Sequence, residues 1–99
     1  MNIVERVNEE ETILAVEGRI DATNSKELQD AIIGAFQSTK NLAVDFEKVV
    51  YIASAGLRAL LLGQKTAISK SGMMKLIHVC DDVMDVLRIT GFDSALHIE

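Results

Sequence analysis

Hydrophobic residues fall in short runs that polar turns separate along the whole chain. The stretch Thr12–Gly18 is apolar without a break from Ile13 to Val16, which is typical of a strand covered on both faces. The other strand-like runs are Ile3–Val7, Asn41–Phe46, Met74–Val79 and, as an edge strand, residues 95–99.

Helical spacing separates these runs. The first helix is predicted to begin at Ser25, because Asn24 and Glu27 have the spacing of a capping pair. Its apolar stripe consists of Leu28, Ala31, Ile32, Ala35 and Phe36. A second helix is expected over Ala55–Ser69, with an inner side made of Leu57, Leu60, Leu61 and Ile68. A short third helix, capped by Asp81 or Asp82, is expected to end at Gly91.

The order of these elements predicts an α/β fold, a mixed sheet of four to five strands flanked by three or four helices. The gap between the first two strands has the length of a turn, so we expect them to pair antiparallel. The later strands are separated by helices and are expected to be parallel.

Composition narrows the class of protein. The 99 residues suffice for one domain, and 48% hydrophobic residues with 25% charged residues are typical of a folded chain. A net charge of −5 gives no basic patch for nucleic acid, and no apolar run approaches the length of a membrane span. Because the sequence starts without a signal-peptide pattern and carries only Cys80, we expect a cytoplasmic protein without a disulfide or direct membrane insertion.

Ser54 lies in the stretch YIASAGLRALLLG, at a predicted strand-to-helix turn, and this position makes its hydroxyl a candidate functional group. The pattern of a nucleophile elbow is only half matched, since Gly56 is present but Ile52 stands where the first glycine belongs. Ser54 can also cap the helix, and a phosphate on it would lie where the helix dipole favours negative charge. His78 and His97 lack the spacing of metal ligands, and Cys80 is expected to be an inert, partly buried thiol. We therefore expect no catalytic residues, no metal site and no cofactor.

Three segments together resemble the STAS domain of bacterial anti-sigma factor antagonists: VEGRIDATNSKEL, LAVDFEKVVYIASAGLRALL and VMDVLRITGFDSALHI. The resemblance covers essentially all 99 residues and implies a STAS domain over residues 1–99. It implies an anti-sigma factor antagonist that binds an anti-sigma factor with serine kinase activity and so regulates sigma-factor-dependent transcription. Phosphorylation by that kinase ends the complex, and a serine phosphatase resets the switch.

The resemblance also implies site residues. Ser54 matches the phosphorylated serine, Asp21 the acid in the loop after the second strand, and Asp45 the acid ending the third strand near the same site. The implied partner-binding residues beside them are Ala53, Ala55, Gly56 and Arg58. The chain departs from the family pattern at Ala53, where Asp or Ser is common, and we expect the loss of a polar group beside Ser54 to affect phosphoryl transfer more than partner binding.

Two other functions stay open. The same fold serves in accessory subunits of membrane lipid transporters, where the same face docks on an ATPase. A small serine hydrolase would use Ser54 with downstream acids and His97.

Overall fold

The computed structural model describes residues 1–99 and shows one five-stranded sheet with four helices. The elements are β1 Asn2–Val7, β2 Thr12–Ile20, α1 Ser25–Phe36, β3 Asn41–Ile52, α2 Ser54–Ser69, β4 Met73–Ile77, α3 Asp81–Thr90, α4 Phe92–Ala95 and β5 His97–Ile98. The strands lie in the order β1-β2-β3-β4-β5. β1 and β2 pair antiparallel, and all other neighbours pair parallel, which confirms the predicted α/β fold and strand directions.

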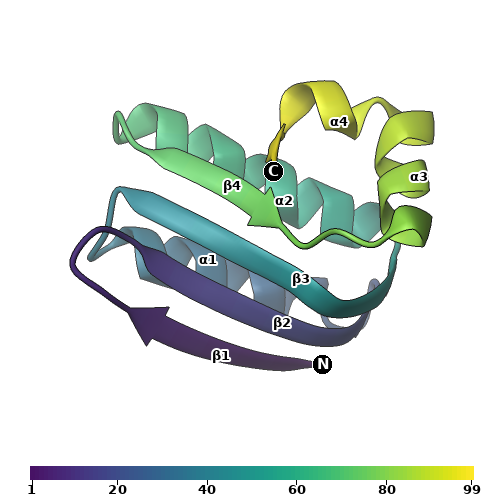
Figure 1. The fold of residues 1–99 in the computed structure, drawn as a ribbon, viewed down its shortest axis with the longest axis horizontal. Coiled ribbons are helices and arrows are strands. Elements are labelled where there is room, and N and C mark those ends of the chain that lie inside the picture. Colours follow the sequence, from purple (N-terminus) through teal and green to yellow (C-terminus); the bar gives the residue numbers. More distant parts are fainter.

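Helices α1 and α2 pack on one face of the sheet, behind it in Figure 1, while α3 packs against the end of β3 and α4 lies next to β5. The expectation that β2 is covered on both faces is therefore wrong. Thr12, Leu14 and Val16 point to the helices and are buried, whereas Ile13 and Ala15 on the opposite face are only half-buried. No helix lies over that second face, which we call the open face of the sheet.

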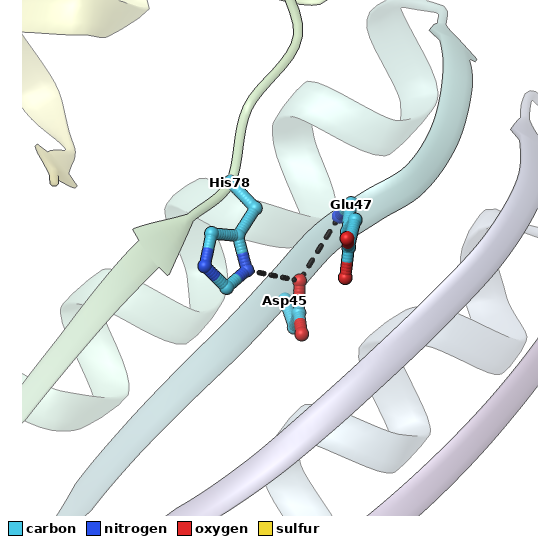
Figure 2. Close-up of side chains that lie close together, drawn as sticks. All are labelled: Asp45, Glu47 and His78. Carbon is cyan, nitrogen blue, oxygen red and sulfur yellow. Dashed lines mark hydrogen bonds and ion pairs between the residues drawn. The ribbon is translucent and has the colours of Figure 1, made fainter.

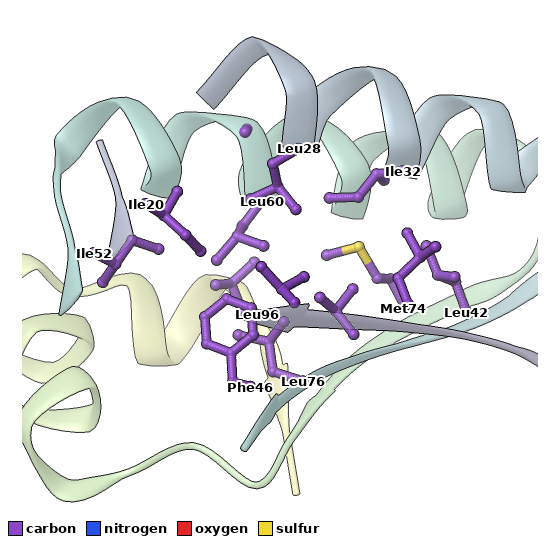
Figure 3. Packing of buried hydrophobic residues seen from close by; sticks show 14 of the residues in the cluster. Ile20, Leu28, Ile32, Leu42, Phe46, Ile52, Leu60, Met74, Leu76 and Leu96 are labelled. Atoms are coloured by element: carbon purple, nitrogen blue, oxygen red, sulfur yellow. The ribbon is translucent and has the colours of Figure 1, made fainter. Parts of the chain in front are cut away.

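The core fills the space between the covered face and the two long helices, and Val83 and Leu87 of α3 together with Leu96 extend it at one side (Figure 3). Four of the five residues of the predicted α1 stripe are buried, and Ala31 is half-buried. On α2 the prediction is wrong at Ile68, which is 66% exposed, and at Leu61, which is only half-buried. The buried face of this helix runs instead through Gly56, Leu57, Ala59, Leu60, Gly63 and Ala67, because small residues let α2 lie close to the sheet and to α1.

Strand β3 is twice as long as predicted, because it continues through Ile52 instead of ending at Phe46. Its pairing with β2 shifts register twice, between Ala15 and Glu17 and between Gly18 and Arg19. At each shift β3 advances one residue more than β2, and such bulges bend a strand. The bent end of β3 carries the chain toward the start of α2 (Figure 1).

None of the helices combines the length and the apolar character needed to cross a bilayer.

Gly56 holds α2 against the ends of β2 and β3, and this contact gives a test of the fold. A Cβ atom at position 56 would lie 2.6 Å from Ile20 Cγ2 and 2.8 Å from Ile52 Cγ1. We expect Gly56→Ala to lower the free energy of unfolding by about 1–2 kcal/mol, the net of overpacking and of alanine's better helix propensity. Urea unfolding followed by circular dichroism measures it.

Gly34 in α1 is the matched control, since a Cβ atom there meets no heavy atom within 4 Å. Gly34→Ala should raise the free energy of unfolding by about 0.5–1 kcal/mol. Equal effects of the two substitutions would contradict a close packing role for Gly56.

Candidate functional site

The start of α2 lies directly beside the end of β2. Ile20 and Ile52 are paired at the ends of β2 and β3, and the next backbone group, Ala53 N–H, donates to Ile20 O at 2.9 Å. Asp21 follows Ile20 and Ser54 follows Ala53. The two residues singled out from the sequence are therefore brought together by strand pairing, although 33 positions separate them along the chain.

Ser54 is the first residue of α2 and is exposed, whereas Ala53 is the N-cap. The prediction that Ser54 caps the helix is thus wrong by one position. The Ala53 carbonyl accepts from the N–H groups of Gly56 at 2.9 Å and Leu57 at 3.1 Å. No side chain caps the helix, so the N–H groups of Ser54 and Ala55 have no partner within the chain.

Asp21 builds the turn that leads from β2 into α1. Its Oδ1 atom accepts from the Thr23 hydroxyl at 2.6 Å and from the Thr23 N–H at 3.0 Å. These hydrogen bonds, the hydroxyl first, hold the pKa of the Asp21 carboxyl below its usual value. Asn24 is the N-cap residue of α1, as predicted, but its side chain does not cap the helix: Oδ1 accepts from Asp21 N–H and the amide donates to Arg19 O, which closes the turn.

Arg19 and Tyr51 extend this region. The Arg19 guanidinium lies 4.2 Å from the centre of the Tyr51 ring, a cation–π contact between paired residues of β2 and β3. Sequence reasoning missed both residues, because nothing in their local pattern indicates that their strands are neighbours in this register. We call the exposed or half-buried residues Arg19, Asp21, Tyr51, Ala53, Ser54, Ala55 and Arg58 the α2 surface.

The sequence matches the family described as "Mlab, STAS domain" over residues 3–98. The chain belongs to the STAS-domain family. BtrV of Bordetella bronchiseptica, provisionally named an anti-sigma factor antagonist, is 28% identical over 83 residues, which are 83% of this chain and 72% of BtrV.

Solved structures support the same assignment of the fold. An anti-sigma factor antagonist from Mycobacterium paratuberculosis superimposes with a TM-score of 0.86 at 19% identity, covering 98% of this chain and 83% of that one. Unphosphorylated SpoIIAA, a Bacillus protein, gives 0.76 at 16% identity, covering 99% and 87%. The predicted resemblance is confirmed: the STAS family match spans residues 3–98, and the proteins of similar sequence and fold include ones named as anti-sigma factor antagonists.

Two residues expected at the partner-binding site are not part of the exposed α2 surface. Gly56 of the STAS domain is buried against Ile20 and Ile52, so it supports the α2 surface from beneath and offers no surface to a partner. Asp45 does not end β3 but lies seven residues before its last residue, on the open face of the sheet. At about 3.3 Å per residue this separates it from Ile52 by roughly 20 Å of strand.

Asp45 instead belongs to a second cluster with Glu47 and His78 (Figure 2). Its Oδ1 atom accepts from the Glu47 N–H at 3.0 Å and lies 3.0 Å from His78 Nδ1. Hydrogen bonding to the Asp45 carboxylate, supported by its charge, raises the pKa of His78 above 6.5. The sequence could not indicate this cluster, since 33 residues separate Asp45 from His78.

The remaining reactive side chains of the STAS domain are engaged away from Ser54. His97 pairs with Glu99 at 3.1 Å, so neither histidine contacts the serine as a hydrolase mechanism would require. Cys80 is exposed, which corrects the prediction of a partly buried thiol. It is also the N-cap of α3, where Asp81 or Asp82 was predicted.

The uncapped start of α2 gives a test of the site's local structure. Ala53 has extended backbone angles (φ −103°, ψ 173°) that suit a capping side chain. We expect Ala53→Asp to raise the free energy of unfolding by about 1 kcal/mol, because the new carboxylate would accept from free helix N–H groups. Ala53→Val, which keeps extended angles but cannot accept, is the control in urea unfolding, and equal stability of the two variants would contradict the assignment of the cap.

The Asp45–His78 pair gives a pH test. NMR titration of the His78 imidazole, with EDTA added to keep free metal ions away from the histidine, should report a pKa above 6.5. Asp45→Asn should return this pKa toward 6.5. Because the folded-state pKa is the raised one, the pair's contribution to stability is full below 6.5 and is lost as the pH rises through the raised pKa. The stability difference between wild type and Asp45→Asn should therefore shrink with rising pH, and a constant difference would refute the pairing.

Proposed function

We propose that this STAS domain is a cytoplasmic anti-sigma factor antagonist, a binding protein and not an enzyme, whose partner is an anti-sigma factor with serine kinase activity. The partner covers the α2 surface, phosphorylates Ser54 and is thereby released, and a serine phosphatase restores the binding form. The observation that carries the proposal is the exposed Ser54 at the first position of α2, beside Asp21 and above the packed Gly56.

The local chemistry suits a phosphate on this hydroxyl. The N–H groups of Ser54 and Ala55 are free, and the helix dipole favours negative charge at this end. Arg58 follows Ser54 by four residues, is exposed and lies on the same helix face, and helical side chains lean toward the N-terminus. Its guanidinium can therefore pair with the phosphate.

The same chemistry explains release. The surface around Ser54 is formed by the small side chains of Ala53 and Ala55, which a partner can cover closely. A phosphate would bring about −1.5 to −2 charges into that contact, near the acidic loop residue Asp21 that the Ala53–Ile20 hydrogen bond holds beside the start of α2. Burial of this charge opposes binding. Relatives of the fold support the idea, since SpoIIAA has been solved in a phosphorylated form and a serine-to-glutamate variant of RsbS from Moorella thermoacetica has the same fold.

The proposal is tested with the anti-sigma factor kinase of the same organism. We expect wild type to bind it, to gain one phosphate with ATP and then to dissociate, as read by intact mass and calorimetry. Ser54→Ala should bind but gain no phosphate. Ser54→Glu should bind on the order of 100-fold more weakly, because a charge enters the contact. Tight binding by Ser54→Glu, or phosphate gain by Ser54→Ala, would overturn the switch.

A charge control separates the α2 surface from the rest of the helix. Arg58→Ala should weaken binding of the kinase, while Lys65→Ala, an exposed cation further along α2, should not. Equal loss of affinity in the two variants would show that the partner responds to the net charge of the chain and does not contact this surface specifically.

A second candidate keeps the fold and changes the partner: an accessory subunit of a membrane lipid transporter that docks on the transporter's ATPase. A solved protein of a sulfate transporter family from Wolinella succinogenes, which shares this fold with a TM-score of 0.80 at 20% identity, is the observation that favours a transporter partner. The two functions differ in one readout, because only the first requires Ser54 to gain a phosphate. Binding to a transporter ATPase with no phosphate on protein isolated from its native host would favour the second.

A further inference from the structure

The cluster of Asp45, Glu47 and His78 on the open face has no role in the proposed switch. One oxygen or nitrogen atom from each residue lies within 4.8 Å of the other two (Figure 2). The set combines an imidazole with two carboxylates, the donors that hold zinc and similar divalent cations in proteins.

The backbone places each donor. Asp45 and Glu47 are two positions apart on β3, so both side chains reach the open face. His78 follows Ile77, the β4 partner of Asp45, and would point to the covered face if the strand continued. Instead His78 has φ +57°, which is uncommon for a residue with a side chain, and its ring lies over Asp45.

Two of the donors are already at a suitable separation. Ligand atoms of a tetrahedral zinc ion lie about 3.4 Å apart, given bond lengths near 2.1 Å. His78 Nδ1 and Asp45 Oδ1 are 3.0 Å apart, and the Glu47 N–H fixes the position of that oxygen. The Glu47 side chain is exposed, and one of its carboxylate oxygens already lies within 4.8 Å of a ligand atom of each of the other two residues.

The surroundings leave room for water ligands. Asp45 and Glu47 line a hollow of about 230 Å³ on the open face, to which Arg6, Glu17 and Lys48 also contribute. Lys48 pairs with Glu17 at 3.9 Å, so its charge is partly compensated. The chain as a whole carries a net charge of −5, which favours a cation.

We infer that His78, Asp45 and Glu47 bind a divalent transition-metal cation such as Zn²⁺, with water completing its coordination. The imidazole selects such a cation over Mg²⁺ or Ca²⁺, which prefer oxygen ligands alone. A bound ion would link the turn after β4, which carries His78, to the middle of β3, which carries Asp45 and Glu47. The site is separate from the α2 surface, so it stands or falls independently of the phosphorylation switch.

Calorimetric titration of the full chain with ZnCl₂ tests the site, in a buffer near pH 7.5 that does not bind metal. One ion should bind per chain, and His78→Asn and Asp45→Asn should each weaken binding at least about tenfold. Asparagine is chosen at position 78 because it tolerates a positive φ. Circular dichroism without metal should show both variants folded, since these side chains lie outside the buried core.

The chain supplies its own controls. His97→Asn removes the other histidine, which has one carboxylate partner, and Cys80→Ser removes the only thiol. Both variants should bind Zn²⁺ as wild type does, and Mg²⁺ should bind wild type at least about tenfold more weakly. The inference is overturned by absence of zinc binding, by unchanged affinity in folded His78→Asn, by loss of affinity in His97→Asn or Cys80→Ser, or by equal affinity for Mg²⁺.

Discussion

The contact of Gly56 with Ile20 and Ile52 determines where α2 begins relative to the sheet. A residue with a side chain at position 56 would push the helix away from the paired ends of β2 and β3, and the hydrogen bond from Ala53 N–H to Ile20 O would stretch or break. This contact, the pairing of Ile20 with Ile52 and the hydrogen bond from Ala53 N–H to Ile20 O together hold the loop with Asp21 beside the first turn of α2. Buried apolar packing thus supports the α2 surface from below. The exposed side of this surface, which carries Ser54, can therefore change its charge without disturbing the core.

The positions of the α2 surface and of the Asp45–Glu47–His78 cluster both follow from the fact that the long helices cover only one face of the sheet. Because α1 and α2 occupy a single face, polar side chains of β3 such as Asp45 and Glu47 can stand on the other face without being buried. The bulges of β3 add the length that carries the chain from this open face to the start of α2. The strand that holds Asp45 therefore also delivers Ser54, but to a different part of the surface.

The sequence predicted the elements well where periodicity and turn residues agree, as in the stripe of α1 and the end of α3 at Gly91, whose φ is +80°. It failed where tertiary packing decides. The family resemblance placed Asp45 at the end of the third strand near Ser54, and the local pattern could not show that β3 continues six residues past Phe46. The outward position of Ile68 follows from how closely α2 approaches α1, and the Asp45–His78 pair depends on the register of β3 and β4.

Ala53, where the chain leaves the family pattern, has two opposite physical consequences for the proposed switch. An aspartate there would cap α2 and would occupy the helix N–H groups that a phosphate on Ser54 could use. It would also set a second carboxylate beside that phosphate, in addition to Asp21. With alanine, the N–H groups of Ser54 and Ala55 stay free and Arg58 faces less competition for the phosphate. Alanine at position 53 therefore favours the phosphorylated form of the proposed switch. It also weakens recognition by the kinase, because a polar group beside the Ser54 hydroxyl is missing.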